Sequence, residues 1–355
     1  MARPFVSVLV DTYNHEHFIE KALESVLEQE YPAAEREVIV VDDGSTDGTV
    51  EILRRFASQV RVVHKENGGQ ASAFNAGIAE CRGEIVAFLD GDDWWAPQKL
   101  TMVVETFASE ESVGLIGHGI TEVLPDQTGR VQALRETARF RLDTVAAARQ
   151  FRLRKSFLGT SRMAYRAAVL RRIGRVPEAL TIQADEYLFT VAGLLSEVLI
   201  RREPLTYYRL HDANAFQIAN GNVAALWRKY LVLSALAREL RARLQTERVA
   251  EDICEAVVSS VSVEAELIRL SVESGAPWET IRAEWQSYRI MHEQASAARL
   301  VLKGASLLPA LLLPSRRYFQ LKQQVARNPL YRQARARWLP FSRLEHVEQH
   351  PPERS

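Results

Sequence analysis

The first hundred residues alternate short apolar runs with stretches whose apolar residues recur at helical spacing, and this pattern constrains the fold most strongly. The apolar runs occupy residues 5–10, 38–41, 60–63 and 85–89. The stretches with helical spacing occupy residues 18–27, 50–56 and 74–79. Strands that alternate with helices over short links form a mostly parallel sheet with right-handed crossovers. We therefore predict an α/β fold.

Three of the four apolar runs lead directly into polar residues. These are Asp11-Thr12-Tyr13, Asp42-Asp43 and Asp90-Gly91-Asp92-Asp93. In open α/β sheets, ligands bind outside the carboxyl ends of the strands. A turn would explain one such end, but three ends at the same edge of a sheet predict a shared site.

The last of these ends crowds three carboxylates, Asp90, Asp92 and Asp93, into four positions. Carboxylates this close repel each other unless a cation or several hydrogen-bond donors compensate them. Their oxygens suit Mg²⁺ or Mn²⁺, bridged to a substrate diphosphate. The alternative is an acidic turn, for which Asp-Gly is ordinary chemistry. Which of the three would touch the ion directly stays open at this point.

The chain resembles glycosyltransferase family 2, whose members use nucleotide sugars and have the GT-A fold. The matching segments are 6–14 (VSVLVDTYN), 40–47 (VVDDGSTD), 67–77 (NGGQASAFNAG) and 83–93 (GEIVAFLDGDD), in the family's order and spacing. Asp11 is a departure, because the family usually has proline before Thr-Tyr-Asn. The resemblance covers about 100 residues and predicts a GT-A domain over 1–220, with a nucleotide-sugar half (about 1–100) and an acceptor half (about 101–220).

The resemblance also implies a nucleotide-sugar pocket. Its residues would be Asp11, Thr12, Tyr13, Asp42, Asp43, Asn67, Gly68, Gly69, Asp90, Asp92 and Arg209. Tyr13 would pack against the base, although a tyrosine at a strand end is otherwise a core residue. Asp43 would accept a hydrogen bond from the base. Gly68-Gly69 would let the backbone pass close to the donor, or would form a plain turn.

The metal would be held by Asp92 and Asp93, with Asp90 behind them. In the segment Leu205–Asn214, which resembles the end of the family's catalytic domain, Arg209 or His211 could reach the diphosphate or the metal. We include Arg209 in the nucleotide-sugar pocket and His211 among the metal ligands. A structural role for either residue is the alternative.

The pair Asp185-Glu186 opens an apolar helix, where the helix dipole favours negative charge. On the resemblance, this pair supplies the catalytic base, and we choose Asp185 over Glu186. Neighbouring residues on a helix point about 100° apart, so one of the two faces the site. The alternative is an ordinary charged first turn.

After residue 220 the chain shows no catalytic motif. Residues 221–303 predict long helices at about 223–244, 249–272 and 278–302. Residues 304–355 form a tail in which Arg316–Arg343 contains basic residues but no Asp or Glu, interleaved with apolar and aromatic residues such as Tyr331, Trp338 and Phe341. This pattern suits an interfacial helix on anionic lipid and a lipid-linked acceptor. A solvated helix is the alternative.

Composition limits the partners. Lys+Arg and Asp+Glu are 45 each, and no nucleic-acid motif accompanies the basic tail, so nucleic acid is not expected. The two cysteines, Cys81 and Cys254, suggest reduced thiols in the cytoplasm, with the tail at the inner face of the membrane. The N-terminus lacks the apolar core of a signal peptide. The helical C-terminal half has surface enough for a homodimer.

These features predict a metal-dependent, inverting glycosyltransferase that moves a sugar from a nucleoside-diphosphate sugar, with uridine as the expected base, to a hydroxyl of a glycan or lipid-linked acceptor. Polysaccharide, cell-surface glycan or glycolipid synthesis would be its role. One alternative is a nucleotidyltransferase, but the expected Gly-rich basic loop does not follow the first strand. Another is a non-catalytic nucleotide-sugar binding protein. A glycosidase is disfavoured, because its paired carboxylates need no nucleotide pocket.

Overall fold

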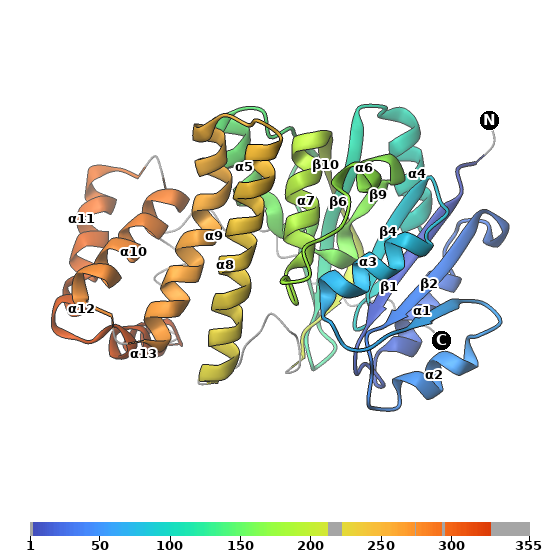
Figure 1. The fold of residues 1–355 in the computed structure, drawn as a ribbon, viewed down its shortest axis with the longest axis horizontal. Coiled ribbons are helices and arrows are strands. Elements are labelled where there is room, and N and C mark those ends of the chain that lie inside the picture. The colour runs from blue at the N-terminus through green and yellow to red at the C-terminus, as the bar shows by residue number, and fades with distance from the viewer. Residues whose placement is uncertain (1–2, 212–221, 274, 293–294, 328–355) are drawn as a thin grey trace. The chain divides into compact units, whose positions relative to one another are not determined.

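The computed structural model describes residues 3–211, 222–273, 275–292 and 295–327, and they divide between two compact units. The first unit, through residue 211, contains the sheet, and the second, from residue 222, is helical (Figure 1). The prediction of an α/β fold with a helical C-terminal region is confirmed. Residues 328–355, most of the predicted tail, lie outside the described residues.

One ten-stranded sheet forms the core of the first unit, with the order β3-β2-β1-β4-β9-β6-β10-β5 and with β7 beside β6 and β8 beside β10. Its strands are β1 (Val6–Thr12), β2 (Arg36–Asp42), β3 (Arg61–His64), β4 (Ile85–Asp90), β5 (Trp94–Trp95), β6 (Val113–Val123), β7 (Gly129–Gln132), β8 (Ala138–Phe140), β9 (Ala164–Arg166) and β10 (Glu197–Arg209). The pairs β1–β2, β2–β3, β1–β4 and β6–β10 are parallel, and the others are antiparallel. The sheet is therefore mixed, with a parallel N-terminal half.

Helices cover both faces of that parallel half because its strands are apolar on both sides. The face that carries Val6, Val8 and Val10 packs against α1 (Ile19–Leu27), α2 (Thr49–Arg55) and α4 (Lys99–Ser109). On the opposite face Phe88 makes edge-to-face contacts with Phe74 of α3 (Gln70–Glu80), at 5.2 Å between ring centroids, and with Tyr165, at 5.5 Å. Successive side chains of β1 and β4 point to opposite faces of the sheet, so each strand packs against helices on both sides.

The sheet continues beyond residue 110. The strand β6 begins with the apolar residues 113–117, continues to Val123 and pairs with β10. The segment 124–150, in which the sequence shows no motif, contains β7, β8 and the start of α5 (Val145–Arg154). These two strands are short and only partly buried, so their sequences lack a regular apolar alternation. The remaining helices are α6 (Ala167–Ile173) and α7 (Ala184–Leu195), with 3₁₀ turns at Ala33–Glu35, Lys155–Leu158 and Thr160–Arg162.

The second unit consists of α8 (Val223–Thr246), α9 (Glu251–Val272), α10 (Pro277–Met291), α11 (Ala297–Ser306), α12 (Leu308–Leu312) and α13 (Ser315–Arg327). The first two match the predicted long helices. The third prediction, 278–302, is wrong, because α10 ends at Met291 and a separate helix begins after Ser296, a residue type that favours helix starts. Over the residues that the structure describes, no helix has the length and apolar composition needed to cross a bilayer.

Phe88→Ala should lower the free energy of unfolding of the sheet unit by about 3–5 kcal/mol, because it removes a fully buried ring from between two other rings. Urea unfolding followed by circular dichroism measures the change. Leu153→Ala, at an exposed position, is the control and should cost less than about 0.5 kcal/mol. Equal losses for the two variants would contradict the packing described here.

Candidate active site

The parallel register brings the three polar strand ends to one edge of the sheet. Asp11 lies beside Asp90, and Thr12 lies beside Asp42. The backbone of Asp43 donates to the carbonyl of Thr12 at 2.9 Å, and that of Gly91 donates to the carbonyl of Asp11 at 2.9 Å. The predicted convergence of these ends is therefore present in the fold.

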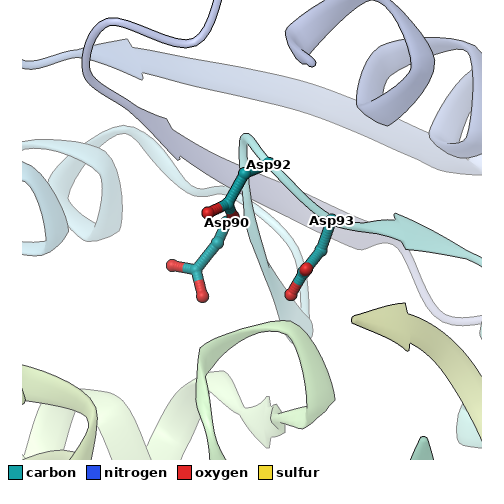
Figure 2. A group of neighbouring side chains, drawn as sticks. All are labelled: Asp90, Asp92 and Asp93. Atoms are coloured by element: carbon teal, nitrogen blue, oxygen red, sulfur yellow. The ribbon is translucent and has the colours of Figure 1, made fainter. Parts of the chain in front are cut away.

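Asp90, Asp92 and Asp93 form a cluster that could hold a metal ion, since one carboxylate oxygen from each lies within 4.8 Å of the others. Figure 2 shows the three carboxylates projecting to the same side of the turn that follows β4. Asp93 is buried, and its Oδ2 has no hydrogen-bond partner. Three carboxylates with a buried oxygen left unpartnered fit a hard divalent cation such as Mg²⁺ or Mn²⁺.

The cluster is electrostatically strained without such a cation. Burial and the charge of Asp92 raise the pKa of Asp93 to about 8. Burial and Asp92 likewise raise the pKa of Asp11 to about 8, and burial with Asp11 raises the pKa of Asp90 well above its usual range. Burial also opposes ionisation of Asp92, but its hydrogen bond with His211 and the nearby histidine charges hold its pKa below the usual range. Positive charge at this edge would let the whole cluster ionise.

Arg209 and His211 lie against the acidic turn. The backbone of Arg209 donates to Asp93 Oδ1 at 3.0 Å, and its Nε donates to the carbonyl of Asp92 at 3.0 Å. Its guanidinium lies over the rings of Phe18 and Trp94, at 4.9 and 4.7 Å from their centroids. His211 Nε2 lies 3.0 Å from Asp92 Oδ2. Both residues therefore position the turn in this structure.

Asp42 and Asp43 organise neighbouring loops. Asp42 accepts from the backbone of Ser45 at 3.0 Å and lies 3.0 Å from His64 Nδ1. Asp43 accepts from Lys65 Nζ at 2.5 Å and from the backbones of Gly68 at 3.0 Å and Gly69 at 2.7 Å. Asp43 thereby holds the segment that contains Asn67, Gly68 and Gly69 beside the strand end.

Tyr13 follows β1, and 43% of its surface is exposed. The alternative of a core tyrosine is therefore wrong, and the ring is accessible to a ligand. Thr12 is buried, and its hydroxyl lies 3.2 Å from His15 Nδ1. His15 is the first of several residues at this edge to which sequence reasoning gave no role.

Asp185 and Glu186 have different environments at the start of α7. Glu186 is buried and pairs with Lys155. Asp185 accepts from the backbone of Glu186 at 2.8 Å. Burial and the charge of Glu186 raise the pKa of Asp185 to about 6. The charge of Asp185 also contributes to the raised pKa of Asp11 and of Asp90, so its ionisation is coupled to that of the acidic cluster.

The sequence analysis also missed Arg162 and Lys99. The positive charge of Arg162 favours ionisation of both Asp93 and Asp185. One guanidinium therefore stabilises negative charge on the acidic cluster and on Asp185. Lys99 is fully buried, donates to the carbonyl of Ser161 at 2.7 Å and lies over the Trp95 ring at 3.7 Å. No sequence pattern indicates these roles, because both residues act on segments that are distant in the chain.

Gln70 joins the loop beside Asp43 to the start of α7. Gln70 donates from Nε2 to Thr160 Oγ1 at 3.1 Å and accepts from the backbone of Ala184 at 2.9 Å. Gln183, just before that helix, has a left-handed backbone φ of 58°, which residues other than glycine rarely adopt. Strain of this kind accumulates at binding and catalytic sites.

The family model described as Glycosyl transferase family 2 matches residues 7–174, which contain all three acidic strand ends. Residues 7–174 belong to glycosyltransferase family 2. The acidic strand ends lie within the region that matches this family. The mixed sheet flanked by helices is the GT-A-like architecture.

Two curated relatives and one solved structure are similar to this chain. An uncharacterized glycosyltransferase of Nostoc sp. is 33% identical over 59% of this chain and 66% of that protein. The putative teichuronic acid biosynthesis glycosyltransferase TuaG of Bacillus subtilis is 39% identical over 36% of this chain and 50% of its own length. The chain thus spans less than two thirds of either relative. The fold resembles Staphylococcus aureus TarS 1-349, with a TM-score of 0.52 and 19% identity over 85% of this chain and 90% of that one.

Gly69→Ala tests the loop beside Asp43. Gly69 has a φ of +80°, and an added Cβ would lie 2.6 Å from Thr181 Cα. We expect a loss of about 2–4 kcal/mol in the free energy of unfolding, combining backbone strain with this clash. Gly174→Ala is the matched control, because its φ is +76° but nothing lies within 4 Å of an added Cβ. Urea unfolding should show a clearly smaller loss for Gly174→Ala, and equal losses would contradict the tight contact at Gly69.

Proposed function

We propose that this chain is a metal-dependent, inverting glycosyltransferase that transfers a sugar from a nucleoside-diphosphate sugar to an acceptor hydroxyl. One observation carries the proposal: the clustered carboxylates Asp90, Asp92 and Asp93 are accompanied by a separate carboxylate, Asp185 of α7, whose charge acts on Asp90 and whose pKa is raised by burial to about 6. A diphosphate donor needs compensating positive charge, and an attacking hydroxyl needs a base. The two acidic elements match these two needs.

In this proposal the donor lies along the ends of β1, β2 and β4. The exposed ring of Tyr13 stacks on the base, and Asp43 accepts a hydrogen bond from the base while it holds the Gly68-Gly69 loop. Asp11, Thr12, Asp42, Asn67 and Arg209 complete the pocket. The S. aureus TarS structure with a similar fold contains UDP-GlcNAc, which supports UDP as the first nucleotide to test.

Asp92 and Asp93 would hold Mn²⁺ or Mg²⁺, with Asp90 behind them and His211 as a further ligand. The unpartnered Oδ2 of Asp93 supports this assignment. When bound, the cation supplies positive charge that stabilises the departing nucleoside diphosphate. Arg209 holds the acidic turn through the Asp92 carbonyl and Asp93 Oδ1, which keeps the carboxylates in place.

Asp185 would act as the general base. It accepts the proton of the acceptor hydroxyl, whose oxygen forms a bond to the anomeric carbon on the face opposite the diphosphate. The bond from that carbon to the phosphate oxygen breaks, so the configuration inverts. Glu186 is a poorer base because Lys155 neutralises it and burial shields it. A pKa near 6 leaves Asp185 ionised but still basic at neutral pH.

The acceptor would be a glycan or a lipid-linked sugar in polysaccharide or cell-surface glycan synthesis. TuaG, whose printed name assigns it to teichuronic acid biosynthesis, supports this class.

The pH dependence of turnover tests the role of Asp185. Donor hydrolysis, in which water replaces the acceptor, is measured as nucleoside diphosphate released from UDP-, GDP- and dTDP-sugars. Because the base must be deprotonated, kcat/KM should fall about tenfold per pH unit below about pH 6. Asp185→Asn should lower kcat by about 10²–10⁴-fold and leave donor KM nearly unchanged.

Glu186→Gln is the neighbouring variant that separates the two carboxylates. Removing the charge of Glu186 should lower the pKa of Asp185 and shift the acidic limb downward by about one pH unit. It should retain most of the turnover at pH 8. If Glu186→Gln were inactive and Asp185→Asn active, the assignment of the base would be wrong.

A further inference from the structure

The short helices α11–α13 carry an unusual concentration of exposed apolar side chains. Seven of the thirteen large hydrophobic residues that are exposed within the described part of the chain lie between 301 and 325. They are Val301, Leu302, Leu308, Leu311, Leu312, Leu321 and Val325, which we call the apolar surface. Single exposed leucines are common on soluble proteins, but such a concentration marks an interaction surface.

These side chains are not needed to pack the helices. Leu307, Ala310 and Tyr318 form a small buried core with partly buried neighbours that include Trp285 and Leu313. Helical spacing therefore gives α12 two sides. Ala310 faces the core, while Leu308, Leu311 and Leu312 share the outer side. Leu311 is 56% exposed and Leu312 is 86% exposed. The unit is packed without them.

The segment that carries this surface has charged residues of one sign. Residues 297–327 contain six Lys and Arg residues and no Asp or Glu. Two of the six, Lys303 and Lys322, pair with Glu284, which is 2% exposed on its side chain. Arg316 and Arg317 at the start of α13 are exposed. Arg317, Leu321 and Val325 are spaced four apart, so they lie on one stripe of α13.

We propose that the apolar surface of α11–α13 docks on an anionic lipid bilayer, with its leucines among the acyl-chain boundary and Arg316 and Arg317 at the lipid phosphates. Exposed apolar residues flanked by arginine and free of acidic residues are the pattern of helices that lie in the bilayer interface. The negative surface of an anionic leaflet attracts such basic groups. A protein partner would need acidic residues facing Arg316 and Arg317. The sequence of 297–327 supplies none, so a second copy of this surface is a poor partner. This inference does not depend on the proposed transferase activity.

Vesicle co-sedimentation of the full chain tests the proposal. The probes are vesicles of phosphatidylcholine alone and of phosphatidylcholine with 30% phosphatidylglycerol. We expect binding at least tenfold stronger to the anionic vesicles, and a further tenfold loss when salt is raised from 0.1 to 0.5 M. The variants are Leu311→Glu with Leu312→Glu, and Arg316→Glu with Arg317→Glu, all at exposed positions. Each pair should reduce binding at least tenfold.

Leu231→Glu on α8 is the matched control, because Leu231 is also a leucine on a helix of the second unit and is 52% exposed. It should bind vesicles within twofold of the wild type, and unchanged circular dichroism should show that all variants fold. Vesicle binding that survives the leucine variants would overturn the proposal. A dimer, seen by light scattering without vesicle binding and lost in the leucine variants, would also overturn it by assigning the surface to a second copy.

Discussion

The site depends on negative charge that is concentrated at one edge of the sheet. Asp11, Asp90, Asp92 and Asp93 come together because β1 and β4 are parallel neighbours in register. Two unit charges 4 Å apart interact by about 4 kcal/mol at the effective dielectric constant of a protein surface, so four carboxylates cannot all ionise there without compensation. Burial, together with the charge of Asp92, raises the pKa of Asp11 and of Asp93 to about 8. A divalent cation held by these carboxylates would relieve this repulsion.

A second carboxylate has a different environment. Asp185 lies in the first turn of α7, and the charge of Arg162 favours its ionisation as well as that of Asp93. Gln70 and the Gly69 loop join the two segments by hydrogen bonds to Thr160, Thr181 and Ala184. In the proposed mechanism, the acidic cluster would act on the departing diphosphate and Asp185, with a pKa of about 6, on the attacking hydroxyl.

The N-terminal half could be predicted from sequence because its buried strands are continuous apolar runs and each acidic group directly follows one. Asp11, Asp42 and Asp90 could therefore be placed at one edge from topology alone. Arg162 and Lys99 could not be placed from the sequence, because their roles arise from packing between segments distant in the chain. The segment 124–150 was missed because β7 and β8 are short and half-buried. The sequence could not separate the environments of Glu186 and Asp185. Only the fold does so, because it places Lys155 beside Glu186.

Calorimetric titration of UDP, GDP and dTDP with and without Mn²⁺ tests the central claim most directly, on the wild type, on Asp93→Ala and on Asp126→Ala, a control at an exposed turn. The account predicts that one nucleotide binds in the presence of Mn²⁺. Its affinity should fall at least a hundredfold without the metal or in Asp93→Ala, and should be unchanged in Asp126→Ala. If no nucleotide bound in the presence of Mn²⁺, or if binding were equal with and without it, the acidic edge would not be a metal–diphosphate site.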